Sequence, residues 1–380
     1  MLSNEPSAPA LAPADRARYC RHLSLPGFGE TGQQRLLAGR VAVIGMGGLG
    51  CPAAMYLAAA GVGVIGLIDG DRVDASNLHR QVLYGDADVG RLKVEVAAER
   101  LRAMNGSISI QAHPVRLQSE NALAELSGYD VIVDGTDNFP ARYLVNDAAV
   151  LLGIPVVHGS VLRYEGRVMV LATAGAPCYR CLYPEPPPAG AVPDCNDAGV
   201  LGVLPGLVGV LQATEVIKLL SATGGGLAGR LLLIDALGTR FQTVTVPRRP
   251  SCPMCGTREI TSLMDYDAFC GHSGGDEVVR LAPSEAAGRL SSGVQVVDVR
   301  ESWEWAICRL PGAILVPLAE LPGRLGDLDA SREIMVYCHR GSRSLEAARL
   351  LRRAGFARVS HVEGGIDRYS AEVDAGVPRY

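Results

Sequence analysis

Over its first 250 residues, the chain alternates short runs of β-branched apolar residues with longer stretches rich in alanine and leucine. This alternation predicts a parallel sheet covered by helices on both faces. The predicted strands are residues 40–44, 62–68, 131–133, 156–158 and 168–173. The predicted helices are residues 51–60, 91–104, 141–152 and 206–220. The last of these is apolar nearly all round, so we expect a buried helix or an oligomer contact.

Residues 257–276 lack periodicity and contain a glycine and serine cluster, which predicts a linker. Beyond it the pattern predicts a second, smaller α/β domain. Its expected helices are 284–291 and 344–354, and its expected strands are 295–299, 333–337 and 359–362. Residues 1–15 predict a disordered lead-in without the features of a secretory signal. The expected organisation is therefore 1–15 lead-in, 16–256 first domain, 257–276 linker and 277–380 second domain.

Length and composition agree with this division. A chain of 380 residues predicts two or three domains. Residues 41–68 carry no charge, but seven glycines and Pro52 break them into strand, turn, helix and strand, so we expect no membrane span. The net charge of −4 and only 5% aromatic residues give no indication of nucleic-acid binding. Ten cysteines without a secretory signal favour metal-binding, catalytic or buried thiols in the cytoplasm.

A glycine-rich turn predicts a nucleotide site. The predicted strand 40–44 leads into Gly45-Met46-Gly47-Gly48-Leu49-Gly50 and then a helix, the context in which G-x-G-x-x-G binds phosphate. Asp69 ends the next strand, where a carboxylate can accept hydrogen bonds from ribose hydroxyls. The motif alone leaves the identity of the nucleotide open.

Further charged residues favour a triphosphate over a dinucleotide. Arg80 and Lys93 supply cations near the nucleotide end of the sheet. Asp137 and Asn138 follow another strand, where an acid can hold a metal ion that bridges phosphates. Cations and a Mg²⁺-binding acid are what nucleotidyl transfer requires, because negative charge accumulates on the phosphate oxygens and on the departing pyrophosphate.

Four cysteines predict a structural zinc site. They form two C-x₂-C pairs, Cys178 with Cys181 and Cys252 with Cys255. Four thiolates complete a closed tetrahedral Zn²⁺ site and leave no position for catalysis. The long separation of the pairs requires tertiary folding to close the site.

Cys338 predicts a reactive thiol. It lies between a strand and a helix, where backbone N–H groups and the helix dipole stabilise a thiolate, with Arg340 and Arg343 adjacent. A cysteine phosphatase needs C-x₅-R, whereas the sixth residue after Cys338 is Ser344 and the arginine comes one position earlier. The shorter loop favours a persulfide over a phosphate.

These motifs resemble known families. Residues 19–256 resemble the ubiquitin-activating (E1-like) ThiF/MoeB family, whose fold is Rossmann-like α/β, through R-Y-C-R-H-L-S-L-P-G-F-G-E-T-G-Q, G-M-G-G-L-G-C, D-G-D-R-V-D-A-S-N-L-H-R-Q, V-G-R-L-K, D-G-T-D-N and the two cysteine pairs. Residues 277–380 resemble rhodanese-like sulfurtransferases through D-V-R-E, R-L-P-G-A and the Cys338 loop. The whole chain is similar to two-domain adenylyltransferase–sulfurtransferases of the MoeZ/MOCS3 type.

The resemblance implies roles for individual residues. The expected ATP-binding residues are Gly48, Asp69, Ser76, Asn77, Leu78, His79, Arg80, Lys93, Asp137 and Asn138, with Asp137 at Mg²⁺. Arg21 matches an arginine that reaches across a homodimer interface to the partner's phosphates. Cys195 matches a cysteine that forms a thioester or releases product by disulfide exchange. Cys20, Cys51, Cys270 and Cys308 receive no role.

The implied reaction joins the two domains. ATP adenylates the C-terminal glycine of a ubiquitin-like sulfur carrier, and a Cys338 persulfide then converts it to a thiocarboxylate. A MoaD-type carrier of molybdenum cofactor biosynthesis is the first choice, and ThiS- or CysO-type carriers of thiamine or cysteine biosynthesis are alternatives. The sulfur donor, thiosulfate or a cysteine desulfurase, stays open. Rival interpretations are an E1 that conjugates its carrier through a Cys195 thioester, a nicotinamide-dependent oxidoreductase, and a scaffold protein.

Overall fold

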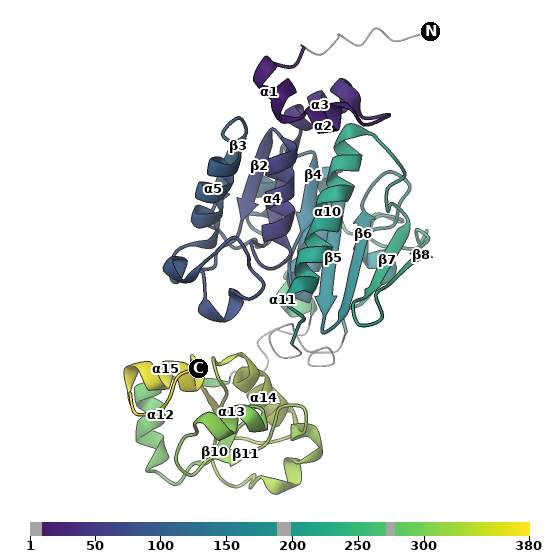
Figure 1. The fold of residues 1–380 in the computed structure, drawn as a ribbon. Helices are drawn as coiled ribbons and strands as arrows, with labels where there is room; N and C mark the ends of the chain where they lie inside the picture. The colour runs from purple at the N-terminus through teal and green to yellow at the C-terminus, as the bar shows by residue number, and fades with distance from the viewer. Residues whose placement is uncertain (1–9, 188–198, 271–277) are drawn as a thin grey trace. The chain divides into compact units, whose positions relative to one another are not determined.

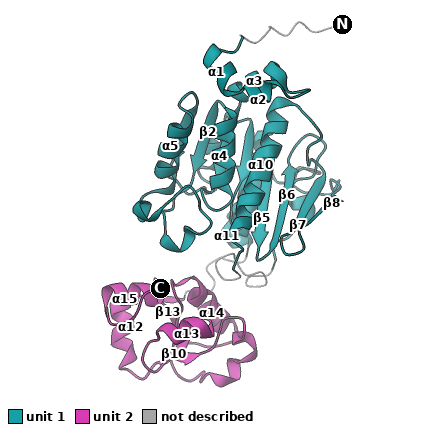
Figure 2. Ribbon diagram, in the orientation of Figure 1, with its two compact units in different colours: residues 1–271 teal, residues 272–380 magenta. Residues whose placement is uncertain are grey.

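The computed structural model describes residues 10–187, 199–270 and 278–380. The chain divides into two compact units, Met1–Gly271 and His272–Tyr380 (Figure 2). Each unit has its own sheet and its own hydrophobic clusters. The first unit therefore continues past the expected linker start at residue 257.

The first unit is built on an eight-stranded sheet with the strand order β3-β2-β1-β4-β5-β6-β7-β8 (Figure 1). The strands are β1 Arg40–Ile44, β2 Val64–Ile68, β3 Ser109–His113, β4 Val131–Asp134, β5 Val156–Leu162, β6 Glu165–Leu171, β7 Arg230–Asp235 and β8 Arg240–Thr245. In this order, neighbouring strands from β3 through β2, β1 and β4 to β5 pair in parallel. From β5 through β6 and β7 to β8, neighbouring strands pair antiparallel. The expected parallel sheet is correct for only part of this sheet, because a tight turn reverses the chain at Arg163 (φ 53°) and starts a meander.

Helices cover both faces of this sheet, as predicted. Val41 and Val43 of β1 join one hydrophobic cluster, while Ala42 and Ile44 join another, as the alternation of side chains along a strand requires. The first cluster includes residues of α3 Gly29–Ala38, α4 Gly50–Ala60, α5 Lys93–Met104 and α10 Val203–Ser221. The second includes residues of α6 Ala122–Leu126, α7 Phe139–Leu152, α8 Tyr179–Leu182 and α11 Tyr266–Phe269. The stretch 41–68 thus forms β1, α4 and β2.

The long helix α10 is the one described helix whose length and mean hydropathy of 1.6 would suffice to cross a membrane. This is weak evidence, since the core helix of a soluble protein passes the same test. Here α10 packs against α4 and the strands β5 and β6, with Val208 and Val216 fully buried. It is therefore a core helix of the first unit, the first of the two alternatives that the all-round apolar pattern predicted.

Two short helices, α1 Pro13–Arg18 and α2 Cys20–Leu23, precede α3. Between them, buried Tyr19 accepts a hydrogen bond from Asn105 (2.9 Å) and lies against Gly61, which follows α4. Because Gly61 precedes β2, this contact places α2 at the amino-terminal edge of the sheet.

The second unit contains five parallel strands in the order β11-β10-β12-β13-β9. They are β9 Val279–Leu281, β10 Gln295–Asp298, β11 Ile314–Leu315, β12 Ile334–Tyr337 and β13 Val359–Val362. The helices are α12 Pro283–Leu290, α13 Ser302–Ile307, α14 Ser342–Arg353 and α15 Gly365–Glu372. Val336 and Tyr337 belong to different clusters, so both faces of this sheet are covered. Short 3₁₀ turns complete the fold: η1 Ala75–Asn77, η2 Asp86–Asp88, η3 Leu321–Gly323 and η4 Leu325–Asp327.

Candidate functional site

A pocket of about 1000 Å³ lies at the carboxyl ends of β1, β2 and β4 in the first unit. Ligands of open α/β sheets bind at this edge. The predicted residues that line it are Gly48, Asp69, Arg80, Lys93, Asp137 and Asn138. The other four predicted nucleotide-binding residues, Ser76, Asn77, Leu78 and His79, do not line it.

The glycine turn follows β1 and opens α4. Gly45 has a φ of +83°, and a Cβ there would lie 2.9 Å from the carbonyl oxygen of Gly135. A Cβ on Gly50 would lie 1.9 Å from the carbonyl oxygen of Gly45, which no side chain can tolerate. The glycines are therefore required to fold the turn, and they leave backbone N–H groups at a helix N-terminus beside the pocket.

Asp69 and Lys93 form the charged centre of the pocket. The carboxylate of Asp69 accepts hydrogen bonds from the backbone N–H groups of Met46 and Asp71, both at 2.7 Å. Burial raises the pKa of Asp69, and the Lys93 ammonium, 3.9 Å away, opposes that shift. Lys93 is itself buried and donates to Asp71 at 2.9 Å. A bound phosphate could take the place of Asp71 as the partner of this cation.

The 3₁₀ turn η1 carries the next predicted residues. Asp74 accepts from the backbone N–H (2.9 Å) and hydroxyl (2.6 Å) of Ser76 and so caps the turn. Arg80 donates to the side-chain oxygen of Asn77 at 2.6 Å. Ser76 and Asn77 thus shape the turn and orient Arg80, which reaches the pocket.

Asp137 lies after β4 on a loop held by buried polar contacts. The carboxylate of Asp134 accepts from the backbone N–H and hydroxyl of Thr136, and it pairs with His158 at 2.7 Å. Burial acts to raise the pKa of Asp134, but His158 and Thr136 outweigh it and hold that pKa below its usual range. Asn138 caps α7 by accepting from the backbone N–H of Ala141 (3.0 Å). The exposed carboxylate of Asp137 therefore projects from a fixed turn, where it suits a Mg²⁺ ion bound to phosphates.

Arg21 is not brought to this pocket within one chain. It is an exposed residue of α2, at the amino-terminal edge of the sheet, whereas the pocket lies at the carboxyl-terminal edge. Cys195 lies outside the described residues.

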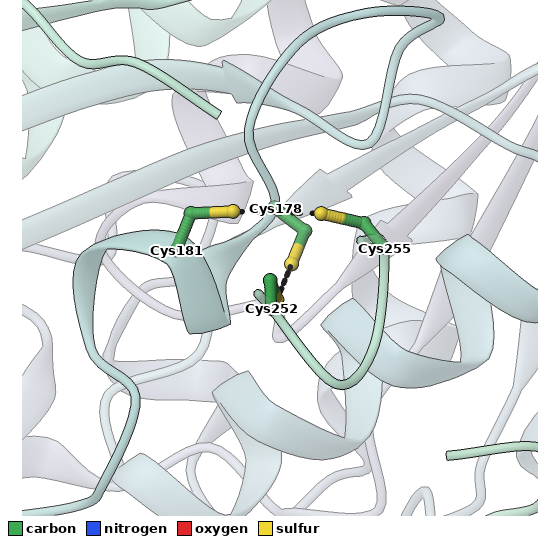
Figure 3. Close-up of side chains that lie close together, drawn as sticks. All are labelled: Cys178, Cys181, Cys252 and Cys255. Atoms are coloured by element: carbon green, nitrogen blue, oxygen red, sulfur yellow. Dashed lines mark hydrogen bonds between the residues drawn. The ribbon is translucent and has the colours of Figure 1, made fainter. Parts of the chain in front are cut away.

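The four predicted metal ligands come together in the first unit (Figure 3). All four sulfur atoms lie within 4.8 Å of one another, with Cys178 and Cys252 3.6 Å apart and Cys181 and Cys255 3.4 Å apart. Tetrahedral Zn²⁺ with Zn–S bonds of about 2.3 Å requires S···S separations of roughly 3.8 Å. Burial raises the pKa of the Cys178 thiol, so its thiolate requires a cation beside it. The residues fit a structural zinc ion.

Sequence reasoning missed the polar cluster beside these cysteines. Arg180, between Cys178 and Cys181, makes a bidentate ion pair with Asp147 of α7, through Nε at 2.9 Å and Nη2 at 2.7 Å. Tyr266 of α11 donates to the same carboxylate at 2.8 Å. The Arg180 side chain is buried, and the motif C-Y-R-C could have drawn attention to it, since a charge inside a metal knuckle needs a partner.

In the second unit, Cys338 lies directly after β12 and before α14, as predicted. Its sulfur accepts from the backbone N–H of Gly341 at 3.1 Å and lies 3.6 Å from the hydroxyl of Ser344. Gly341 has a φ of +97°, which closes the loop back over the sulfur. Ser344 also contacts His361 at 3.3 Å. The sulfur is thus cradled by a backbone N–H and a hydroxyl at the helix N-terminus.

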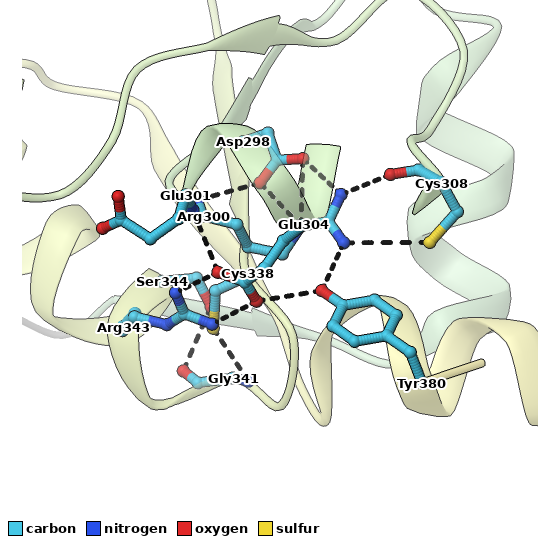
Figure 4. Close-up of polar contacts among 10 residues, drawn as sticks. All are labelled: Asp298, Arg300, Glu301, Glu304, Cys308, Cys338, Gly341, Arg343, Ser344 and Tyr380. Carbon is cyan, nitrogen blue, oxygen red and sulfur yellow. Dashed lines mark hydrogen bonds and ion pairs between the residues drawn. The ribbon is translucent and has the colours of Figure 1, made fainter. Parts of the chain in front are cut away.

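Arg343, an arginine adjacent to the Cys338 loop as the sequence indicated, makes an ion pair with Glu304 of α13 (Figure 4). Glu304 also accepts from Tyr380, whose hydroxyl accepts from buried Arg300. Arg300 in turn pairs with Asp298 at 2.6 Å, so this network connects β10, α13 and α14 behind the loop. Arg340 is the other loop arginine.

Three of the four cysteines without an expected role are buried. Cys51 is buried in α4, and burial raises the pKa of its thiol to about 12. Burial likewise raises the pKa of Cys270 to about 11. Cys308 lies 3.8 Å from Arg300, and Cys20 is exposed on α2.

Comparison with known proteins identifies both units. Residues 19–254 match the ThiF family. The chain belongs to the ThiF family. Residues 282–372 match the rhodanese-like domain, so this member joins a ThiF unit to a sulfurtransferase unit.

Full-length relatives share this arrangement. The chain is 44% identical to the probable adenylyltransferase/sulfurtransferase MoeZ of Mycobacterium tuberculosis, over 98% of this chain and 97% of the relative. It is 41% identical to the adenylyltransferase and sulfurtransferase MOCS3 of Mus musculus, over 99% and 90%. A sulfur carrier protein adenylyltransferase of Thermus thermophilus is 54% identical over 67% of this chain and 96% of its own length. The predicted enzyme classes, adenylyltransferase and sulfurtransferase, are confirmed.

Solved structures agree on the fold of the first unit. Escherichia coli MccB with MccA-N7isoASN superposes with a TM-score of 0.57, at 24% identity, over 63% of this chain and 74% of that one. At this identity the likeness concerns the fold, and it confirms the predicted Rossmann-like α/β architecture.

Proposed function

We propose that this enzyme adenylates the C-terminal glycine of a ubiquitin-like sulfur carrier and then replaces AMP with sulfur from Cys338. The observation that supports the proposal is the presence in one chain of a pocket lined by the glycine turn, Asp69, Arg80 and Lys93, and of a Cys338 loop at a helix N-terminus. The full-length relatives are named for both activities, and the Thermus thermophilus relative is named for a sulfur carrier.

Adenylation takes place in the pocket of the first unit. A carboxylate oxygen of the carrier attacks the α-phosphorus of ATP, the bond to the β,γ-diphosphate breaks, and pyrophosphate leaves. Arg80, Lys93 and the N–H groups of the glycine turn stabilise the charge that develops on the phosphate oxygens. Asp137 would hold Mg²⁺, which neutralises phosphate charge when bound. Asp69 accepts hydrogen bonds from the ribose hydroxyls.

Sulfur transfer uses the loop of the second unit. A donor, thiosulfate or a desulfurase persulfide, first loads Cys338 with a sulfur atom. The terminal sulfur of this persulfide attacks the acyl-adenylate, AMP leaves, and an acyl disulfide joins the carrier to Cys338. Cys195 would then attack the Cys338 sulfur and release the thiocarboxylate. This leaves a Cys195–Cys338 disulfide, which a thiol reductant must reduce.

Two further parts of the proposal concern partners. Arg21 lies at the edge of the sheet opposite its own pocket, so we propose that it serves the pocket of a second copy in a homodimer. A MoaD-type carrier is our first choice, because the N-terminal motif and the cysteine pairs most resemble those of MoeB. ThiS- and CysO-type carriers are the alternatives.

Two variants separate the half-reactions. Cys338→Ser should retain carrier-dependent exchange of labelled pyrophosphate into ATP but form no thiocarboxylate, which adds 16 Da to the carrier when one oxygen is replaced by sulfur. Asp137→Ala should lose the exchange while Cys338 still accepts sulfur from thiosulfate. Exchange that persists in Asp137→Ala would refute the site, and a MoaD-type carrier that gains no mass while a ThiS-type carrier does would refute the first choice of carrier.

A further inference from the structure

The segment expected to be a linker forms part of the nucleotide pocket. Five consecutive residues of this segment, Leu263–Asp267, line the pocket together with the glycine turn. They lie beyond the last zinc cysteine, Cys255, and immediately before the end of the first unit. A linker that only connected two units would have no reason to line a binding pocket.

The pocket lining comes from the glycine turn and from segments further along the sheet edge. Arg80 and Lys93 are cations near the glycine turn, and a third cation, Arg116, lies among residues 115–120 after β3. Apolar residues occur near the turn, as at Leu49, and a second apolar group comes from other elements: Val115, Leu117, Leu144, Leu263 and Met264. Residues 115–120 alternate between half-buried and exposed, with Val115 and Leu117 turned inward. A nucleotide with its phosphates at Arg80 and Lys93 would place its flat, apolar base against this second group.

Position along the sheet supports this orientation. Residues 115–120 follow β3, which lies beyond β2 from the glycine turn of β1. Asp69, at the end of β2, lies between them, and a Cβ on the next residue, Gly70, would lie 3.1 Å from the backbone nitrogen of Arg116. The order glycine turn, Asp69, residues 115–120 matches the order phosphate, ribose, base.

Buried contacts hold the segment in place. The hydroxyl of Ser119 donates to the carbonyl oxygen of Met264, which joins the two apolar walls. Tyr266 donates to Asp147 at 2.8 Å, and Arg180 pairs with the same carboxylate. Arg180 also lies 3.9 Å from the sulfur of Met264. The knuckle that contains Arg180 thus fixes the wall of the pocket.

We propose that Leu263–Asp267 is the base-binding wall of the nucleotide pocket, that Leu263 contacts the purine, and that Tyr266 and Arg180 are positioning residues. This inference rests on the proposed function, because it assumes that the pocket takes ATP. It makes the tether of the sulfurtransferase unit a part of the adenylation site.

The test measures displacement of labelled ATP from the full-length protein by two partial ligands. Adenosine occupies only the base and ribose subsites, and tripolyphosphate occupies only the phosphate subsite. Leu263→Ala should weaken displacement by adenosine at least fivefold and change displacement by tripolyphosphate less than twofold. The matched control Thr261→Ala, an exposed residue of the same segment outside the pocket lining, should change neither.

Tyr266→Phe provides a milder second variant, because it removes only the hydroxyl that contacts Asp147. This variant should weaken the displacement of labelled ATP by adenosine two- to fivefold. Its zinc content and thiosulfate sulfurtransferase activity should be unchanged. Adenosine displacement unchanged in both variants, or weakened equally with tripolyphosphate, would overturn the inference. Failure of the unmodified protein to bind labelled ATP would instead refute the proposed function.

Discussion

Arg343 presents two guanidinium nitrogens to the carboxylate of Glu304, at 2.6 and 2.7 Å. Burial acts to raise the pKa of Glu304, but Arg343 outweighs it and holds the pKa below its usual range, so the carboxylate stays ionised near neutral pH. The pair lies beside the Cys338 loop and compensates a charge that would otherwise attract anions.

Removal of this compensation should favour anionic reagents. Glu304→Gln should raise the rate of Cys338 alkylation by iodoacetate relative to neutral iodoacetamide by roughly fivefold, since two unit charges about 4 Å apart attract each other by about 1 kcal/mol in water. The control is Glu301→Gln, which removes an exposed carboxylate from the same turn. A ratio that stays the same in Glu304→Gln would show that Arg343 does not act on the loop.

The second unit should lose stability in mild acid. His361 is buried, and burial, reinforced by Arg280 and Arg349 and opposed by Glu363, lowers the pKa of its imidazole from 6.5 to about 4. Between these values the unfolded chain binds a proton that the folded unit does not. The contribution of neutral His361 to the free energy of unfolding is therefore complete above pH 6.5. It declines by about 3 kcal/mol as the pH falls toward 4.

Urea unfolding can follow this titration, because the two tryptophans of the chain, Trp303 and Trp305, both report on the second unit. In His361→Asn the fall in unfolding free energy between pH 6.5 and 4 should be smaller by that amount. Parallel curves for the variant and the unmodified protein would contradict the assignment.

The glycine turn should tolerate substitution unevenly. Gly50→Ala places a methyl group 1.9 Å from a backbone oxygen, whereas a Cβ on Gly47 meets its nearest atom at 3.7 Å. We expect Gly50→Ala to lower the free energy of unfolding of the first unit by more than about 3 kcal/mol, and Gly47→Ala by less than about 1 kcal/mol. Thermal unfolding followed by circular dichroism measures both. Equal losses of stability in the two variants would show that Gly50 does not lie as close to the carbonyl oxygen of Gly45 as described.

Loss of the metal should affect the first unit alone. Cys252→Ser should abolish stoichiometric zinc, because three thiolates do not complete a closed site. We expect a fall of at least about 10 °C in the Tm of the first unit, since several kcal/mol of metal binding are removed, with thiosulfate sulfurtransferase activity retained. Metal analysis of the unmodified protein provides the reference, and a zinc-free native protein would refute the site.

Local patterns predicted the parts of the fold that depend on neighbouring residues. Strand 40–44, the glycine turn and the following helix were predictable because each depends on a few adjacent residues. The strand β3 was missed because Ser109–His113 contains little apolar character, and β8 because all six of its residues are exposed. Hydrophobic periodicity cannot mark a strand without a buried face.

For the candidate site too, only the features that depend on neighbouring residues could be predicted from the sequence. The cysteine pairs and Cys338 carry their chemistry in short motifs. The Arg343–Glu304 and Arg180–Asp147 pairs join residues more than 30 positions apart, and spacing carries no signal for such contacts. The predicted linker 257–276 overlaps the first unit for a related reason: Leu263–Asp267 has no regular pattern along the chain, and its place at the pocket depends on contacts with Ser119, α7 and the zinc knuckle.

The separate hydrophobic clusters of the two units have a practical consequence for engineering. Because, among the described residues, none of these four clusters contains side chains from both units, a foreign sulfurtransferase could be grafted onto the adenylating half without repacking its interior. The junction for such a chimera belongs after Cys270, since a cut at the zinc cysteines would remove Tyr266 and its neighbours from the recipient.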